Sequence, residues 1–172
     1  MIDGVGMPDT WQRMWAPHRM EYLRGENRPL ADNDVQCPFC RIPSLSDEEG
    51  LLVHRGTNAY VVMNLYPYNA GHLLVCAYRH VADLTDLTDE ERNEISALTA
   101  HAMQTIRKVA NAAGFNIGMN QGEASGAGVA EHIHQHVVPR WGGDSNFMPI
   151  IGGVKVLPQL LSQTRADLAA AW

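Results

Sequence analysis

Three histidines at strict two-residue spacing, His132, His134 and His136, are the side chains of this sequence best suited to chemistry. In an extended strand alternate side chains share a face, so neighbouring imidazoles would stand about 6.6–7 Å apart, while Ile133 and Val137 face a core. Near neutral pH, imidazole serves as a nucleophile, as an acid or base, or as a metal ligand. A lone strand histidine is usually a half-buried polar residue, but three in register favour a functional face.

This face has two chemical interpretations. In the first, one imidazole acts as a nucleophile and its neighbours assist it through hydrogen bonds. In the second, all three histidines hold a catalytic zinc ion, because imidazole is a good zinc ligand and His-x-His pairs on strands bind this metal. The histidine pattern alone does not separate the two, so other parts of the sequence have to.

Cysteine placement points to a second chemical site. Cys37 and Cys40 form a Cys-x-x-Cys pair, whereas Cys76 lies inside an apolar run and is expected to be a small buried hydrophobic residue. A cytosolic protein rarely holds a structural disulfide, which leaves metal binding or redox chemistry for the pair. The redox motif should open a helix after a buried strand, and the polar segment 31–36 is not such a strand. The pair therefore favours a metal.

Length, composition and charge limit the possible classes of protein. The chain has 172 residues, 45% of them hydrophobic, which suits one domain with a sizeable core. Its apolar runs are too short to span a bilayer and its first residues lack a signal-peptide pattern, so we expect a cytoplasmic protein that does not bind membranes. The net charge is −6 without a Lys/Arg cluster, which argues against nucleic-acid binding. A polyphosphate substrate would need local donors, among which Arg140 and Lys155 are candidates.

Hydrophobic patterning and turn signals predict an α+β fold: an antiparallel sheet of about five strands with a long helix and a C-terminal helix. Thr88 and Glu91 form a capping box that opens the long helix, which we expect to run to about residue 113 and to stop at Gly114. Pro158 is expected in the first turn of the C-terminal helix. The other expected elements are a helix over 8–24, a polar loop over 25–36, and strands over 51–55, 58–64, 72–79, 115–120, 132–138 and 146–151.

The expected domain organisation follows from these elements. Residues 1–36 should form a helical and loop extension, and residues 37–172 the folded domain. Within that domain, the small-residue loop from Gly122 to Gly128 directly precedes the histidines. Its backbone N–H groups can cradle a phosphate.

The string from His132 to Val138, in which Gln135 is the unusual member, resembles the histidine-triad (HIT) family of nucleotide hydrolases and transferases. Further matches are Asn64-Leu-Tyr-Pro, Gly71-His-Leu-Leu-Val and the segment after Arg140. The resemblance covers residues 37–157 and implies a HIT-like fold. The longer string around the triad looks like the bacterial diadenosine-tetraphosphate phosphorylase and hydrolase branch.

The resemblance implies roles for the site residues. His134 would attack an α-phosphate and form a covalent nucleotidyl-histidine, with His136 donating hydrogen bonds to phosphate oxygens. His72 would be a further donor, unless it is an ordinary histidine beside a turn. The remaining nucleotide and phosphate contacts implied are Asn64, at the ribose position or simply forming the turn, and Asn120, Ser125 and Gly126.

The family commonly carries a Gln and a Ser or Thr shortly before the triad. This chain has Ala127 and Gly128 there, so the phosphate contacts would fall to backbone N–H groups.

For the cysteines, the resemblance implies a structural zinc site. Some relatives bind zinc with such a pair, a histidine after the third strand and the first triad histidine; here these are Cys37, Cys40, His80 and His132. Four such ligands close a tetrahedron and leave no open position for catalysis.

The function implied is the cleavage of dinucleoside polyphosphates such as diadenosine tetraphosphate, with phosphorolysis by inorganic phosphate favoured over hydrolysis. Three alternatives stay open: a nucleoside phosphoramidate hydrolase, a nucleotide-binding regulatory module with little turnover, and a catalytic zinc hydrolase that uses all three triad histidines. HIT proteins usually pair through the long helix and an edge strand, so we expect a homodimer.

Overall fold

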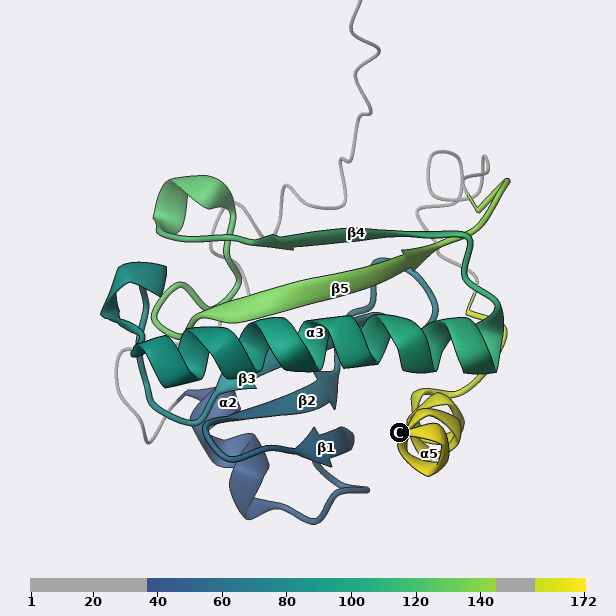
Figure 1. Cartoon of the computed structure of the whole chain (residues 1–172), viewed down its shortest axis with the longest axis horizontal. Coiled ribbons are helices and arrows are strands. Elements are labelled where there is room, and N and C mark those ends of the chain that lie inside the picture. Colours follow the sequence, from purple (N-terminus) through teal and green to yellow (C-terminus); the bar gives the residue numbers. More distant parts are fainter. Residues whose placement is uncertain (1–36, 145–156) are drawn as a thin grey trace, which may run out of the picture.

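A five-stranded antiparallel sheet forms the centre of the computed structural model, which describes residues 37–144 and 157–172 (Figure 1). The strand order is β1-β2-β3-β5-β4, and every neighbouring pair runs antiparallel. The α+β fold expected from the sequence is confirmed. The strands are β1 (Leu52–Arg55), β2 (Ala59–Met63), β3 (Leu73–Ala77), β4 (Gly114–Met119) and β5 (His134–Arg140).

Helices cover the two faces of the sheet unequally. The long helix α3 (Asp89–Ala110) crosses one face, and α5 (Leu161–Ala171) packs beside α3 and β1 (Figure 1). The short helix α2 (Pro38–Arg41) lies against the other face. Three single turns of 3₁₀ helix connect these elements: η1 (Ile42–Ser44), η2 (Leu84–Asp86) and η3 (Glu123–Ser125).

The pleat of the sheet separates two sides. One side packs into the core, and the other, the chemical face, carries His134 and His136. On the α3 side, Ile133 and Val137 are buried in the main core together with Val75 of β3. On the opposite side, His134 pairs across the sheet with Cys76, and His136 pairs with Leu74. The alternation predicted for the histidine segment is therefore confirmed.

The boundaries of two elements differ from those expected. The capping box at Thr88 and Glu91 is present, but α3 ends earlier, because Asn111 adopts a left-handed conformation with φ 50° and caps it. Asparagine tolerates this conformation better than most residues do. Gly114, expected to stop the helix, begins β4 instead. The histidine strand begins at His134, after His132, and extends to Arg140.

The start of α5 also differs. Pro158 precedes the helix rather than occupying its first turn, and Leu160 is the N-cap residue. The expected helix over 8–24, the loop over 25–36 and the strand over 146–151 fall outside the described residues. The domain boundary at residue 36 stays a prediction.

Among the described helices, none combines the length and apolar character needed to cross a bilayer.

Glu91 joins the start of α3 to the end of β3. Its carboxylate accepts hydrogen bonds from Thr88 N at 2.8 Å and from Arg79 Nε and Nη2 at 2.9 and 2.7 Å. The hydrogen bonds from Arg79 are the main reason that the pKa of Glu91 falls to about 2. A depressed carboxylate pKa stabilises the folded state above the pKa of the unfolded chain, and this contribution is lost as pH falls toward the folded value.

We therefore expect Glu91→Gln to remove part of the pH dependence of stability between about pH 4.5 and pH 2. The amide can still close the capping box. At pH 7 the free energy of unfolding should fall by about 1 kcal/mol. The effect is this small because Arg79 is exposed, and solvent screens its interaction with Glu91. Acid titrations followed by circular dichroism measure this, and superimposable curves for the two proteins would contradict it.

Candidate active site and metal centre

His134 is held in one tautomer by the backbone. Its Nδ1 lies 2.8 Å from the carbonyl oxygen of His132, and a carbonyl can only accept, so Nδ1–H is the donor. The lone pair is therefore on Nε2. The side chain is 6% exposed, and burial lowers the pKa of His134 below the ordinary histidine value, an effect that the carbonyl opposes in part. A neutral imidazole with a fixed tautomer is a competent nucleophile at pH 7.

His136 is oriented by His72. Tyr68 N–H donates to His72 Nδ1 at 3.0 Å, so the proton of a neutral His72 is on Nε2. That nitrogen lies 3.0 Å from His136 Nδ1 and donates to it. The proton of a neutral His136 is then on its own Nε2. The chain of hydrogen bonds makes His136 Nε2 a donor beside His134, and the centroids of these two rings are 5.0 Å apart.

His72 is enclosed by protein groups. Its side chain is 0% exposed, and both ring nitrogens contact protein groups. The alternative of an ordinary surface histidine beside a turn is therefore wrong. The contact of His72 with a nucleotide stays a prediction.

Two aromatic rings that the sequence pattern does not single out complete this face. Phe39 of α2 lies 4.8 Å from the His134 ring, and Tyr68 stacks at 5.5 Å and 16° on His136. The position of Phe39 between Cys37 and Cys40 was the available signal, since binding of both cysteines near His132 brings the residue between them close to the triad. No comparable signal marks Tyr68, whose placement depends on the loop before β3.

Asn64 takes part in the turn that follows β2. Its Oδ1 accepts from Tyr66 N–H at 2.9 Å, and its Nδ2 lies 3.3 Å from His72 Nδ1. The turn-forming role considered from the sequence is thus present. The side chain adjoins the His72–His136 pair, and a contact with ribose stays a prediction.

The loop before the triad connects β4 to β5. Asn120 follows β4 directly, and Gly126 has a φ of 78°, which favours glycine. Ser125 is exposed, and its hydroxyl donates to Gly122 O at 2.8 Å within the loop. The phosphate contacts expected of Asn120, Ser125 and Gly126 stay predictions, with the Ser125 hydroxyl already engaged.

Arg140 does not offer the unpaired cation that we expected for a polyphosphate. Its Nε and Nη2 donate to the Asp144 carboxylate at 2.6 and 2.8 Å, and its Nη1 donates to Asn116 Oδ1 at 2.7 Å. The ion pair largely cancels its charge. Lys155, the other candidate, lies outside the described residues.

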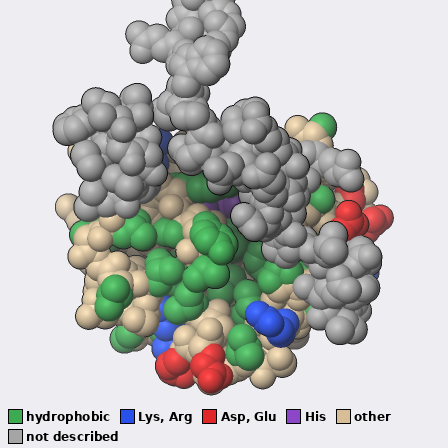
Figure 2. All heavy atoms as spheres, turned by 180° about the vertical axis from the view of Figure 1, so that it is seen from behind, with side chains coloured by type: hydrophobic (Ala, Val, Ile, Leu, Met, Phe, Trp, Pro, Cys, Tyr) green, Lys and Arg blue, Asp and Glu red, His purple; other side chains and the backbone are tan. Residues whose placement is uncertain are grey.

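Viewed from behind α3, hydrophobic side chains gather at the centre of the molecule and a histidine is visible beside them (Figure 2). Beneath the surface on this side of the sheet, a buried apolar cluster contains residues of α2, β1, β2 and β3, among them Phe39, Tyr60 and Leu74. Tyr60 fixes α2 in place, because its hydroxyl donates to Phe39 O at 2.7 Å. Phe39 of this cluster lies against the His134 ring, so the cluster adjoins the two imidazoles.

Four donor groups meet at the other end of the triad. One ligand atom each from Cys37, Cys40, His80 and His132 lies within 4.8 Å of all the others. His132 Nε2 lies 2.9 Å from the carbonyl of Ala77, so Nε2 carries the proton and Nδ1 presents its lone pair to the two sulfurs, each 3.4 Å away. The three cysteines of the chain are free of disulfides.

The donor set fits a tetrahedral metal ion. Sulfur and nitrogen ligands of one zinc ion should be about 3.6 Å apart. The sulfur–nitrogen distances here are 3.2 to 3.4 Å. Two thiolates would neutralise a divalent ion, and the Ala77 carbonyl orients one imidazole from behind. The four residues that the resemblance implied as ligands are thus together, and they could bind a metal.

The catalytic zinc hypothesis lacks such geometry. Among the described residues, the ligand group that is close enough for a metal contains His132 but neither His134 nor His136. His132 faces the cysteines, and its carbonyl oxygen faces His134. The first triad histidine is therefore part of the group that could bind a metal, and the other two histidines lie outside that group.

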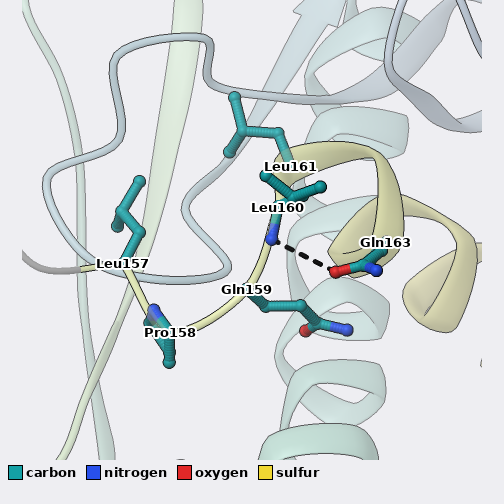
Figure 3. Close-up of a pocket in the computed structure, with 6 residues that line it drawn as sticks. All are labelled: Leu157, Pro158, Gln159, Leu160, Leu161 and Gln163. Atoms are coloured by element: carbon teal, nitrogen blue, oxygen red, sulfur yellow. Dashed lines mark hydrogen bonds between the residues drawn. The ribbon is translucent and has the colours of Figure 1, made fainter.

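A separate hollow of about 370 Å³ lies at the start of α5 (Figure 3). It is lined by Leu157 and the segment that leads into the helix, where Leu160 N donates to Gln163 Oε1 at 3.4 Å. None of its lining residues is a histidine or a charged residue. It has no part in the site described above.

Comparisons with known proteins agree with this geometry. A HIT domain model matches residues 48–143, more than half of the chain. AP-4-A phosphorylase of Mycobacterium tuberculosis (strain ATCC 25618 / H37Rv) is 53% identical over 172 residues, which cover 98% of this chain and 88% of that protein. The asymmetrical bis(5'-nucleosyl)-tetraphosphatase of Schizosaccharomyces pombe is 38% identical over 78 residues, 45% of this chain and 42% of that protein.

Among solved structures, a Zn-bound histidine triad family protein from Mycobacterium smegmatis has the same fold. It matches with a TM-score of 0.64 at 28% identity and covers 81% of this chain and 94% of that one. The domain match, the extent of the sequence identity and the shared fold show that this chain belongs to the HIT family.

Proposed function

We propose that the protein cleaves dinucleoside polyphosphates such as diadenosine tetraphosphate through a covalent nucleotidyl-histidine on His134. The observation that carries the proposal is the pair of fixed tautomers: a lone pair on His134 Nε2 and a proton on His136 Nε2. The extended similarity to the M. tuberculosis AP-4-A phosphorylase supports the substrate class. A module that merely binds nucleotides has no need for a neutral nucleophile beside a fixed donor.

The first step of the proposed reaction forms one bond and breaks one. His134 Nε2 attacks the α-phosphorus, and the bond from that phosphorus to the bridging oxygen breaks, releasing a nucleoside polyphosphate. The Nε2–H of His136 donates to an oxygen of the transferring group and stabilises the charge that develops there. The Nδ1–H of His134 stabilises the cationic ring of the intermediate by donating to the His132 carbonyl.

In the second step, an oxygen of inorganic phosphate or of water attacks the same phosphorus and restores the lone pair of Nε2. Phosphate yields a nucleoside diphosphate and water a monophosphate. Since both reactions share the intermediate, a local site that positions phosphate decides between them. The similarity to a phosphorylase favours phosphate.

Several residues would contact the nucleotide in this proposal. Asn64, next to the His72–His136 pair, would bind the ribose hydroxyls, with its amide leaving the turn contact to do so. Asn120 and the backbone N–H groups around Ser125 and Gly126 would bind phosphate. The Phe39 ring, which lies beside His134, would contact the base.

We further propose zinc as the ion at Cys37, Cys40, His80 and His132, in a structural role. Thiolate and imidazole ligands suit zinc, and four of them leave no open position. The similar M. smegmatis structure is described as Zn-bound. The ion would tie α2 to the start of β5 and thereby hold Phe39 against His134.

A homodimer through α3 and β4 completes the proposal. Strand β4 lies at one edge of the described sheet, and its Ile117 is 44% exposed. Val109 near the end of α3 is also exposed. An exposed strand edge beside an apolar helix position is a natural pairing surface.

His134→Ala should lower turnover of diadenosine tetraphosphate by at least about a thousandfold, because the nucleophile is lost. Nucleotide binding, measured by calorimetry, should change far less. His101→Ala on α3 is the matched control and should keep normal turnover. In wild type, mass spectrometry after a denaturing alkaline quench should find the nucleotidyl group on His134. Near-normal turnover of the alanine variant would refute the proposal.

Elemental analysis should find about one zinc ion per chain, and its removal by a chelator should lower the melting temperature. Cys37→Ser should lose the ion and much of the thermal stability. Cys76→Ala, which alters a buried cysteine outside the ligand group, should keep the full zinc content. Metal-free protein that melts like the wild type would contradict the structural role.

Incubation with diadenosine tetraphosphate and inorganic phosphate should yield ADP and ATP, because phosphate resolves the intermediate on His134. Labelled phosphate should appear in ADP. Formation of AMP and ATP at every phosphate concentration would show a hydrolase instead. Cleavage of a nucleoside phosphoramidate alone would show that the substrate class is different.

Light scattering should give the mass of a dimer for the wild type. Ile117→Lys should shift it to a monomer, because a charge at the strand edge opposes pairing. Leu160→Lys, which changes an apolar residue at the start of α5 that is even more exposed than Ile117, should leave the dimer intact. A monomeric wild type would exclude the proposed pairing.

A further inference from the structure

We propose that Asn69 and Asp144 are positioning residues that fix the ring tautomers of His72 and His136. The inference rests on the proposed function for its catalytic consequence, although the tautomers can be measured without any substrate. Neither residue belongs to the triad or to the metal centre. Their contacts connect the loop that carries His72 to the end of strand β5.

Asn69 is buried, with 8% of its surface exposed, and its amide group bridges two parts of the chain. Its Nδ2 donates to Pro139 O at 3.0 Å and to Asp144 Oδ2 at 2.8 Å. Both acceptors lie some seventy residues further along the chain. A buried amide with two such long-range hydrogen bonds holds its loop in one position.

Asp144 is the fixed acceptor in this cluster. Its carboxylate accepts from Arg140 Nε at 2.6 Å and Nη2 at 2.8 Å, and from Trp141 N at 3.2 Å. The hydrogen bond from Arg140 is the main reason that the pKa of Asp144 lies well below its usual range. The carboxylate therefore stays charged and in place. Asn69, Asp144 and Arg140 together form a clamp between the loop and the end of β5.

The clamp acts on the loop that contains the His72 contacts. His72 N–H donates to Asn69 O at 3.2 Å, and Tyr68 N–H donates to His72 Nδ1 at 3.0 Å. Gly71 has a φ of 71°, and a Cβ there would meet Pro139 Cγ at 3.6 Å, so the loop packs closely on β5. The backbone on both sides of Asn69 thus depends on where its side chain is held.

The catalytic consequence follows from the tautomers. While Tyr68 N–H points at His72 Nδ1, the proton of His72 is on Nε2, and His136 Nδ1 must accept. Release of the loop removes the Tyr68 donor and leaves the Asn64 amide, whose Nδ2 lies 3.3 Å from His72 Nδ1, as the remaining group that favours the proton on Nε2. The tautomer with the proton on Nδ1 then becomes accessible to His72, because a side-chain amide can turn away. His136 would then donate from Nδ1 to His72 and present a lone pair from Nε2. A lone pair repels the phosphate oxygens that a proton would stabilise.

The direct test is nuclear magnetic resonance of the imidazole nitrogens in the full-length, metal-loaded protein. Long-range proton–nitrogen spectra distinguish the two tautomers of each neutral ring. The wild type should show His72 and His136 with the proton on Nε2. Asn69→Ala should shift the nitrogens of both rings toward a mixture of tautomers.

Asn116→Ala is the matched control. This residue is also an asparagine bonded to the clamp, because its Oδ1 accepts from Arg140 Nη1 at 2.7 Å, but in the described part of the chain its side chain has no hydrogen bond to Asn69 or to the His72 loop. In this variant, the ring nitrogens of His72 and His136 should give the same spectra as in the wild type. Asp144→Asn, which keeps the shape of the side chain and removes its charge, is the second variant and should shift the same two rings even if Asn69→Ala does not fold.

Kinetics separate positioning from general destabilisation. In Asn69→Ala, kcat for diadenosine tetraphosphate should fall about tenfold or more, while KM stays within about twofold. In a His72→Ala background, Asn69→Ala should have little further effect, because both act through one element. A global loss of stability would instead make Asn69→Ala lower kcat by the same factor in the wild-type and in the His72→Ala background.

The outcomes are distinguishable. Unchanged tautomers in both Asn69→Ala and Asp144→Asn would overturn the inference, as would equal effects of Asn69→Ala with and without His72. Shifted tautomers in a protein that does not act on dinucleoside polyphosphates would support the clamp and refute the proposed function. Wild-type rings that already carry their protons on Nδ1 would refute the hydrogen-bond order itself.

Discussion

The alternation of side chains along β5 determines both the packing of the core and the position of the two site histidines. Val137 and Ile133 are buried against α3, and this burial fixes the register of the strand between β3 and β4. A shift by one residue would expose both and bury the histidines in the main core. The same packing that stabilises the sheet therefore decides which face carries His134 and His136.

His132 connects the candidate metal site to the candidate active site. Its ring points at the two cysteine sulfurs, while its backbone carbonyl accepts the hydrogen bond that sets the tautomer of His134. One residue thus contributes to both sites through different atoms. Phe39, between the cysteines, makes a second link because it lies against the His134 ring. Loss of order at the candidate metal site would reach His134 by either route.

The sequence predicted features that depend on local pattern. Two-residue spacing placed His134 and His136 on one face, and the Thr88 capping box located the start of α3. The end of α3 was wrong because glycine seemed the natural stop, whereas Asn111 takes the left-handed conformation three residues earlier. Local propensity allows either residue, and only the packing of the chain chooses between them.

Contacts between distant segments could not be predicted in this way. The sequence marks His72 as a histidine near a turn, but its place behind His136 depends on the pairing of β3 with β5 and on the path of the loop. Arg140 looked like a cation for phosphate, and Asp144 four residues later was the overlooked partner. The family resemblance supplied the metal ligands, which spacing alone leaves ambiguous.

A covalent bond between His134 and the α-phosphorus would leave its mark on the stereochemical course of the reaction. Each in-line displacement at phosphorus inverts its configuration, so two successive displacements restore it. A diadenosine tetraphosphate analogue with a chiral thiophosphate at the α-position should therefore give a product with retained configuration. Inversion would show that phosphate or water attacks the substrate directly, and it would contradict the covalent role of His134.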